Sequence, residues 1–429
     1  MTQITLRRDA WHTDEETVLK IPDGWTVNVT GNQPLPALSA AEIDSRTDDP
    51  IDSPLLADLA KGKKSAVILV DDITRPTPAD KLLPGLIRRL QQGGIPPEGM
   101  KILAACGSHR EPTPAEIIQK VGMEIPAAVQ IFTHECRKDC AQAGSTAAGT
   151  PVWLNQRMLA SELKIGVGSV YPHPAAGFSG GGKIMALGAA GYETIRVLHD
   201  NQPGTERRTG EIDHPFRRQI SEIARLGGLS FIVNVTLNQD RQICGLFAGG
   251  PDRAFAEAAA FARQHYTVPV DRSAEVVIAD MYPFDMDFQY ALDRGFWPFE
   301  FSSKHSVKIM LAHCPAGIGS HEFFPAANPA AARLKRRLKN FTFRDLFTLP
   351  ARLRAVRRMA WRRNLEVIVV SPFITPAELK ETLPRGVTAV DWESAVRMVS
   401  SKFPGQSNLR AALYRTAPLM LPDPGNPTP

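Results

Sequence analysis

The sequence has few cysteines, few aromatic side chains and no long apolar run. Only 5 of its 429 residues are cysteine, an odd number scattered along the chain, which fits reduced thiols better than a disulfide framework. Aromatic residues make up 7% of the chain beside 43% hydrophobic and 22% charged residues, the composition of an ordinary soluble globular protein. No stretch approaches the roughly 20 consecutive apolar residues of a membrane-spanning helix. Residues 1–16 also carry charges where a signal peptide needs an apolar stretch, so we expect a cytoplasmic protein.

The chain also has little excess of charge of either sign, with 50 basic against 45 acidic residues and a net charge of +5. The charge is unevenly distributed, because residues 333–363 hold twelve basic residues and one acidic residue, Asp345. That segment is net +11 and the remainder of the chain is net −6, which argues against a diffusely basic nucleic-acid-binding protein. We interpret the segment as the solvated face of helices whose leucines turn inward; the alternative is an anionic partner or a subunit interface.

Ligand types for a metal lie close together at His134, Cys136 and Cys140. A structural zinc site needs a second ligand pair at a suitable spacing, and the segment lacks one. A structural metal here is therefore the less favoured interpretation.

Short β-branched runs alternate with helix-like stretches in the first part of the chain. A helix is expected from Thr113, where Thr113 and Glu116 form a capping-box pattern. Strands separated by crossover helices predict an α/β domain with a mainly parallel sheet. The expected strands cover residues 65–70, 100–105, 129–133, 164–170, 231–237 and 242–247.

The alternation restarts beyond residue 270, with apolar runs at 274–279, 306–312 and 365–370. We therefore expect two α/β domains with mainly parallel sheets and the active site in the cleft between them. The first domain would cover residues 1–270 and bind the cofactor. A smaller second domain would cover 271–420, with its last helix able to pack back on the first. The Pro-rich residues 421–429 are expected to be a disordered tail.

Two loops that follow expected strands carry polar side chains suited to chemistry. The first, Asp71-Asp-Ile-Thr-Arg-Pro-Thr-Pro78, offers the planar guanidinium of Arg75 to a carboxylate or phosphate, and Asp72 could orient a hydroxyl or hold Arg75. A capped strand-to-helix turn is the structural alternative. The second, residues 106–112, carries His109, a candidate general acid or base if the two strands are neighbours.

A glycine-rich segment from residue 171 to residue 199 is the most informative motif. Gly180, Gly181 and Gly182 precede Lys183, a pattern suited to an anion held by backbone N–H groups. Gly177 to Lys183 fits G-x-x-x-x-G-K, but the next residue is Ile184, so the hydroxyl that holds Mg²⁺ in a nucleotide triphosphatase is missing. The segment also supplies a nucleophilic amine at Lys183 and two imidazoles, His173 and His199, that could act as base or metal ligand.

These three segments together resemble the lactate racemase family, whose members use a nickel-pincer nucleotide. The matching motifs are DDITRPTP at 71–78, GSHR at 107–110 and HPAAGFSGGGKIMALGAAGYETIRVLH at 173–199. The resemblance spans most of the first domain, in the same order along the chain.

The resemblance implies roles for these residues in a hydride-transfer mechanism. Lys183 occupies the position joined to the cofactor through a thioamide, and His199 the position that ligates nickel. His109 and His173 match the acid and base on opposite sides of the substrate, where hydride leaves C2 for the cofactor and returns to the other face of a transient 2-keto acid. Arg75 would hold the substrate carboxylate, and Asp72 would position nearby groups. The cofactor-binding set is completed by Thr74, Ser179, Gly180, Gly181 and Gly182.

The second domain departs from the family pattern near the expected substrate position. Lactate-specific members carry a Tyr-Gln pair with a Lys three residues after the Gln, and here the stretch reads Phe288, Gln289 and Leu292. Loss of a hydroxyl and a cation predicts a substrate other than lactate, contacted by Gln289 and Phe288. Nearby aromatics suggest a larger or more apolar side chain, unless they pack between the domains: Phe284, Tyr290, Phe296 and Trp297.

These observations predict a racemase or epimerase of a 2-hydroxy acid, an isomerase that depends on a nickel-pincer nucleotide and on the enzymes that synthesise it. A sugar-acid C2 epimerase is an alternative in the same class. The alternative from another class is a nucleotide- or phosphate-binding protein without redox chemistry, a cofactor carrier or sensor. The expected partners include no nucleic acid and no membrane.

Overall fold

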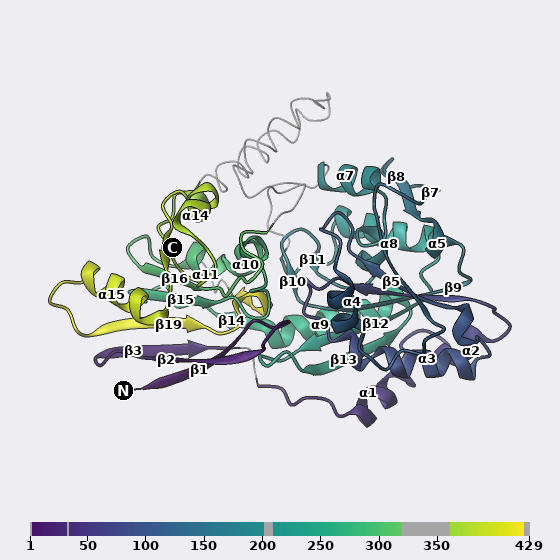
Figure 1. Cartoon of the computed structure of the whole chain (residues 1–429), viewed down its shortest axis with the longest axis horizontal. Helices are drawn as coiled ribbons and strands as arrows, with labels where there is room; N and C mark the ends of the chain where they lie inside the picture. The colour runs from purple at the N-terminus through teal and green to yellow at the C-terminus, as the bar shows by residue number, and fades with distance from the viewer. Residues whose placement is uncertain (1, 32–33, 201–208, 320–360, 424–429) are drawn as a thin grey trace. The chain divides into compact units, whose positions relative to one another are not determined.

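A computed structural model describes residues 2–31, 34–200, 209–319 and 361–423 (Figure 1). The chain divides into two compact units. One comprises residues 35–202 and 207–264, called here the site unit. The other comprises residues 1–34, 203–206 and 265–429, called here the terminal unit.

The site unit is built on a six-stranded sheet of order β13-β12-β9-β4-β5-β6. All neighbours run parallel except β12 and β13, which are antiparallel. This confirms the mainly parallel α/β domain, and each strand lies within two residues of its expected range at either end. The strands are β4 (Ala66–Asp71), β5 (Met100–Ala105), β6 (Gln130–Thr133), β9 (Leu163–Ser169), β12 (Phe231–Leu237) and β13 (Ile243–Gly249).

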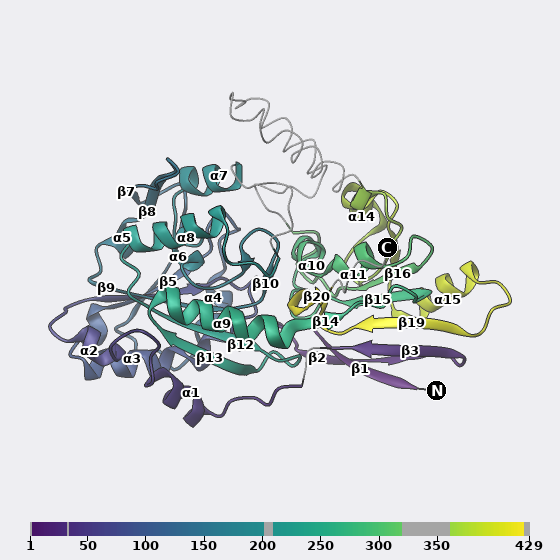
Figure 2. The same ribbon diagram turned by 180° about the vertical axis from the view of Figure 1, so that it is seen from behind.

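Helices and a hairpin surround this sheet. The expected capping box at Thr113 and Glu116 begins α4, because each side chain accepts from the other's backbone N–H. In Figure 2, α9 runs along the sheet in front of β12 and β13. The helices are α1 (Ala40–Thr47), α2 (Leu56–Ala60), α3 (Leu83–Gln92), α4 (Pro114–Val121), α5 (Gln156–Leu159), α6 (Lys183–Ala186), α7 (Tyr192–Asp200), α8 (Pro215–Leu226) and α9 (Pro251–Tyr266), and the hairpin pairs β7 (Cys140–Ser145) with β8 (Pro151–Asn155).

The terminal unit contains a second six-stranded sheet, of order β18-β17-β16-β15-β19-β3, in which every pairing is parallel. Alternate residues of β15 face opposite sides, so Val277 and Ala279 enter one apolar cluster while Val276 and Ile278 enter another. Both faces are thereby covered, as parallel sheets require. The strands are β3 (Trp25–Thr30), β15 (Val276–Asp280), β16 (Val307–Leu311), β17 (Ile368–Val370), β18 (Val387–Ala389) and β19 (Leu409–Tyr414).

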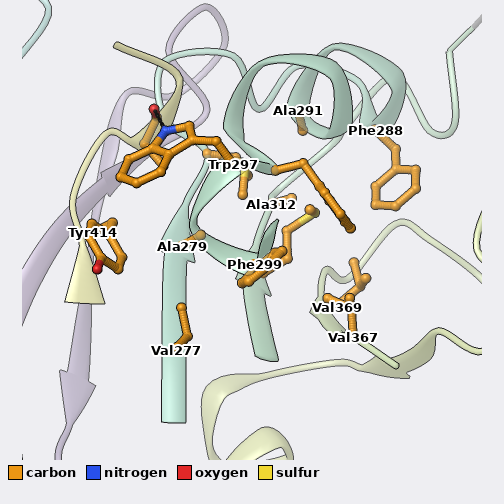
Figure 3. Packing of buried hydrophobic residues seen from close by; sticks show 14 of the residues in the cluster. Val277, Ala279, Phe288, Ala291, Trp297, Phe299, Ala312, Val367, Val369 and Tyr414 are labelled. Atoms are coloured by element: carbon orange, nitrogen blue, oxygen red, sulfur yellow. Dashed lines mark hydrogen bonds between the residues drawn. The ribbon is translucent and has the colours of Figure 1, made fainter. Parts of the chain in front are cut away.

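The first face of this sheet is covered by α10 (Phe288–Gly295), α11 (Trp297–Phe301) and α14 (Pro376–Thr382). The second is covered by α15 (Trp392–Lys402) together with the hairpin of β1 (Gln3–Arg8) and β2 (Glu15–Lys20). Figure 3 shows aromatic side chains of α10 and α11 packed over the first face.

The expected domain boundaries differ from the structure at the ends of the chain. Residues 1–34 were assigned to the first domain, but β3 pairs in parallel with β19 and belongs to the terminal unit, as the adjacent purple and yellow strands in Figure 1 show. Strand pairing across more than 370 residues leaves no local signal in the sequence. The longest segment of the terminal unit begins at residue 265, five residues before the expected boundary at residue 270.

The last helix and the tail belong to the terminal unit. The last helix, α15, is expected to be able to pack back on the first domain, and its Trp392 donates Nε1 at 2.8 Å to the carbonyl of Lys20, a residue that the expected boundary places in that domain. Both residues lie in the terminal unit, where α15 joins the apolar cluster of the sheet. The expected tail begins with a strand, because β20 (Leu421–Asp423) pairs in parallel with β14 (Thr267–Pro269). Residues 424–429 lie outside the described residues.

Most of the basic segment at 333–363 also lies outside the described residues. At its described end, Arg362 forms an ion pair with the buried Glu300, and its guanidinium lies 5.5 Å from the ring centroid of Phe296. Within the described ranges, no helix is both long enough and apolar enough to cross a membrane.

Candidate active site

The expected catalytic residues follow neighbouring strands of the site unit at its topological switch point. From β4 the chain proceeds to β5 and β6 on one side of the sheet and later to β9 and β12 on the other. Ligands of open α/β sheets bind beyond the carboxyl ends of strands at such a point. The loops after β4, β5 and β9 carry Asp72 and Arg75, His109, and His173.

Asp72, His109 and Arg75 form a connected group. His109 Nδ1 lies 2.8 Å from Asp72 Oδ2, and His109 Nε2 lies 3.3 Å from an Arg75 guanidinium nitrogen. Because a carboxylate only accepts and a guanidinium only donates, Nδ1 carries the imidazole proton and Nε2 the lone pair. The second Asp72 oxygen accepts from the backbone N–H of Thr74 at 2.8 Å and from the Thr74 hydroxyl. Thr74, expected to bind the cofactor, is thus part of the support for Asp72.

The charges around His109 favour this neutral form. Burial lowers the pKa of His109, and the positive charges of Arg75 and Lys183 lower it further, while Asp72 opposes them. Burial alone would raise the pKa of Asp72, but His109, Arg75 and Thr74 hold that pKa well below its ordinary range. An ionised carboxylate behind a neutral imidazole is the arrangement of a general base.

His173 has the opposite hydrogen-bonding pattern. It lies in a short hairpin of β10 (Pro172–His173) and β11 (Gly177–Phe178). Its Nδ1 accepts from the backbone N–H groups of Ala175 at 3.2 Å and Ala176 at 3.1 Å. In the neutral ring the proton is therefore on Nε2, so His173 presents a donor where His109 presents an acceptor.

The glycine-rich loop is shaped by close packing. A Cβ at Gly180 would lie 2.7 Å from Val170, at Gly181 2.7 Å from Phe255, and at Gly182 2.6 Å from Ala224. The Gly181 N–H donates to Asn234 Oδ1 at 2.8 Å. Three close contacts, with Val170 directly after β9 and with side chains of α8 and α9, account for the three glycines without an anion. An anion contact at this loop stays a prediction.

Substitution of Gly181 tests this packing explanation. Gly181 has φ of +59°, and an added methyl group would press on the Phe255 ring, so Gly181→Ala should lower the free energy of unfolding by about 2 kcal/mol. In a Phe255→Ala background the loss should shrink by about 1 kcal/mol, measured by urea unfolding as a double-mutant cycle. Equal losses in both backgrounds would contradict a clash with Phe255.

Ser179, a second expected anion ligand, is engaged within its own loop. Its hydroxyl donates to the Ser169 carbonyl at 2.6 Å and accepts from the Tyr171 N–H at 3.0 Å. The side chain thereby ties the segment after β9 to the hairpin that carries His173. A role for Ser179 at a phosphate stays a prediction.

Lys183 and His199 suit a covalently attached, metal-containing group. Lys183 begins α6, and its charge contributes to the lowered pKa of His109. His199 lies in α7, where its Nδ1 is 2.7 Å from the Ile195 carbonyl oxygen. Nδ1 must donate to that carbonyl, so Nε2 carries the lone pair that a metal accepts, and a fixed tautomer is usual for metal-binding histidines.

Comparison with known proteins agrees with these motifs. The family model described as the lactate racemase N-terminal domain matches residues 12–210. The lactate racemase of Lactiplantibacillus plantarum is 32% identical over 289 residues, 66% of this chain and 68% of the relative. That of Thermoanaerobacterium thermosaccharolyticum is 30% identical over 285 residues, 65% of this chain and 66% of the relative. The chain belongs to the lactate racemase family.

Solved structures agree on the fold. The lactate racemase apoprotein from T. thermosaccharolyticum superimposes with a TM-score of 0.75 and 24% identity, covering 98% of this chain and 100% of that one. A protein from Thermotoga maritima gives a TM-score of 0.61 at 15% identity, over 90% of this chain and 98% of the other. At these identities the comparison concerns the fold alone.

The expected substrate residues of the terminal unit lie in α10, and one of them is buried. Phe288 has 0% exposure and belongs to an apolar cluster with Trp297 and Phe299, so the expectation that it contacts substrate is wrong (Figure 3). Leu292, where lactate-specific relatives were expected to carry Lys, packs against the same cluster. Gln289 is partly buried, and its contact with substrate stays a prediction.

Two of the other aromatics of this stretch belong to the interior of the terminal unit. Phe296 and Trp297 lie in its apolar cluster, and Trp297 donates through Nε1 to the Ala417 carbonyl at 2.9 Å. Phe284 and Tyr290 are buried as well, with 1% and 6% exposure. These buried rings give no support for a large or apolar substrate.

His134 is fully used by the fold. Its Nε2 donates to the Ala190 carbonyl at 2.8 Å, and its Nδ1 accepts from Asn155 at 3.2 Å. Burial lowers the pKa of His134 and raises that of Cys140 to about 11. Both His134 nitrogens are occupied, so this histidine does not offer a lone pair to a metal.

Two further residues, Asn234 and Lys120, support the site and were not expected from the sequence. Asn234 holds the glycine-rich loop through Gly181. It is the central residue of the buried strand Phe231–Leu237, in which Thr236 is the only other polar residue, a pattern that could have identified it. Lys120 donates to the Arg75 carbonyl at 2.9 Å, but nothing in the spacing of α4 distinguishes it from a solvated lysine.

Proposed function

We propose that the protein is a racemase or epimerase of a 2-hydroxy acid that works with a nickel-pincer nucleotide. The observation that carries the proposal is the pair of histidines with opposite roles: His109 backed by Asp72 and offering a lone pair, and His173 held by backbone N–H groups and offering a proton. Family membership supports the reaction type, since the named relatives are lactate racemases.

In the proposed mechanism, the chain's own residues bind the substrate and move its hydroxyl proton. Arg75 pairs with the substrate carboxylate, which draws its guanidinium from His109 Nε2. That nitrogen accepts the C2 hydroxyl proton, and Asp72 stabilises the resulting imidazolium. When bound, the cofactor supplies an acceptor and donor for the C2 hydride. His173 Nε2 donates a proton to the carbonyl oxygen after the transient 2-keto acid has presented its other face. His109 then loses its extra proton and His173 regains one by exchange with water, which restores both rings for the next turnover.

Lys183 and His199 would hold the cofactor. The Lys183 amine would form the covalent link and His199 Nε2 would ligate nickel, a role consistent with the hydrogen bond of its Nδ1. We further propose that the substrate is not lactate, because Leu292 packs into the core where a cation was expected.

Co-expression with the cofactor-synthesis enzymes, followed by intact mass and metal analysis, tests the proposal. The wild type should show a mass increase and bound nickel. Lys183→Ala should lose the mass increase, while the control Lys61→Ala, at a side chain 71% exposed, should retain it. A wild type that binds neither nickel nor nucleotide would overturn the proposal; bound cofactor without a mass increase would overturn only the covalent link.

A panel of single-enantiomer 2-hydroxy acids, including lactate, then identifies the substrate by loss of optical purity. His109→Ala and His173→Ala should each abolish racemisation while retaining bound nickel, because neither residue is assigned to the cofactor. Full activity in either variant would contradict the two-histidine mechanism. Loaded cofactor with no turnover across the panel would favour a carrier or sensor.

The pH dependence should show the protonation state of His109. Only neutral His109 can accept a proton, and burial and the charge of Arg75 lower its pKa from the ordinary 6.5. The charge of Lys183, which lowers this pKa in the cofactor-free protein, would be lost once its amine forms the covalent link. For the enantiomer that uses His109 as base, kcat/KM should therefore hold at neutral pH and fall only as pH drops through a value below 6.5. An acid limb at or above that value would contradict the assignment.

A further inference from the structure

Lys120 is a buried cation directly behind the catalytic loop. It lies in the last turn of α4, where it and Val121 are the buried residues of the helix, and it is only 2% exposed. Lysine is rarely buried unless its ammonium has partners. A lysine at one of two inward positions of a surface helix therefore calls for an explanation.

The ammonium of Lys120 joins the end of β4 to the loop that follows it. Nζ lies 2.5 Å from Asp71 Oδ1 and donates to the backbone carbonyl of Arg75 at 2.9 Å. The other Asp71 oxygen accepts from the Thr77 hydroxyl, whose oxygen in turn accepts from the Ser169 N–H at 3.0 Å and hydroxyl at 2.8 Å. The network thus connects α4, the 72–78 loop and the end of β9.

Stability alone does not account for this ion pair. Burial lowers the pKa of Lys120 and raises that of Asp71, so the loss of hydration disfavours the charged form of both groups. Replacing a buried ion pair by neutral residues of similar size is often neutral or stabilising, whereas removing one partner is costly. What an apolar replacement cannot supply is a donor to the Arg75 carbonyl.

We propose that Lys120 is a positioning residue for the reaction, which holds the Arg75 backbone so that its guanidinium lies against His109. The geometry rests on the 2.9 Å contact from Nζ to the Arg75 carbonyl and the 3.3 Å contact from Arg75 to His109 Nε2. Arg241 assists from another element by donating Nε to the Pro76 carbonyl at 3.0 Å. The functional importance of Arg75 rests on the function proposed above.

Titration of His109 in the cofactor-free protein tests the positioning role without an activity assay. The charges of Asp72, Arg75 and Lys183 contribute to the pKa of His109. If Arg75 moves away, the His109 pKa should rise by about one unit, because a positive charge at contact distance is lost. The measurement is NMR of the imidazole ring against pH, with the His109 signal assigned from its absence in His109→Gln.

The variant is Lys120→Met combined with Asp71→Asn, which removes both buried charges and leaves an acceptor for Thr77. The matched control is Lys164→Met, since Lys164 is also buried and donates Nζ to a carbonyl, that of Ser161 at 2.5 Å, but lies at the amino end of β9. The control should leave the His109 pKa unchanged. The single variant Lys120→Arg, which keeps a donor and a positive charge, should have a His109 pKa close to that of the wild type.

A folded double variant whose His109 titrates as in the wild type would overturn the proposal, and so would an equal rise in Lys164→Met. If the double variant fails to fold, Lys120→Arg and Lys120→Met decide: the pKa of His109 should rise in the Met variant, which has no donor for the Arg75 carbonyl, and not in the Arg variant. Once a substrate is known, the double variant should raise KM about tenfold with a smaller change in kcat, because Arg75 binds substrate. Failure to find racemisation would leave the NMR result standing.

Discussion

Replacing Asp72 by Asn should lower the racemisation rate by about 10³-fold or more, with little change in cofactor loading. One Asp72 oxygen accepts from the N–H of Thr74 at 2.8 Å and from its hydroxyl, while the other faces His109 Nδ1 at 2.8 Å. In the variant, the amide oxygen must face Thr74, so the NH₂ group faces His109. His109 would then carry its proton on Nε2, the nitrogen that has to accept one.

The matched control is Asp48→Asn, at a carboxylate that pairs with Arg89 Nε at 2.7 Å in the same unit. This change removes an ion pair but touches no residue of the catalytic group, so the rate should remain within about twofold. Nitrogen NMR of the His109 ring gives a direct measurement of the tautomer. Retention of the Nδ1 proton in Asp72→Asn together with full activity would contradict the base assignment.

Replacing Phe288 by Ala should lower the free energy of unfolding by about 3–5 kcal/mol. Phe288 is 0% exposed among the aliphatic and aromatic side chains of the terminal unit, so its removal leaves a cavity that rigid strands and helices cannot close (Figure 3). Urea unfolding followed by circular dichroism measures the loss.

The control for this substitution is Phe373→Ala, at a ring that is 47% exposed and makes an edge contact with His313. Its loss should cost less than about 1 kcal/mol. If Phe288 contacted substrate instead, Phe288→Ala would raise KM and leave stability near that of the control. A small loss of stability with a large change in KM would therefore contradict the core assignment.

The strands were predictable because their signal is local. Buried parallel strands read as short apolar runs, and the Ala66–Asp71 and Phe231–Leu237 strands are buried along almost their whole length. The capping box at Thr113 is likewise contained in four residues. The pairing of β3 with β19 is not local, so the assignment of the first 34 residues to the wrong unit had no contrary signal.

The candidate site was predictable in its members and less so in their roles. Asp72, Arg75 and His109 were expected together from their positions after neighbouring strands, and the structure connects them. The glycines were expected as an anion cradle, yet the contacts of Gly181 with Phe255 and of Gly182 with Ala224 come from parts of the chain distant in sequence. Phe288 was expected to contact the substrate, and its burial could not be predicted either. Burial depends on packing partners that the spacing of residues does not reveal.

The composition of the chain argued against a membrane-spanning helix and against a diffusely basic protein, and the motifs identified the family. The amino-acid sequence by itself thus determined the fold class, the family and most of the polar residues at the strand ends, because periodicity, capping and motif spacing are properties of short segments. Only the tertiary structure decided which nitrogen of His109 and of His173 carries the proton, and that Lys120 reaches the Arg75 carbonyl. Hydrogen-bond direction and burial arise from groups brought together across the fold, so they cannot be determined from any one segment.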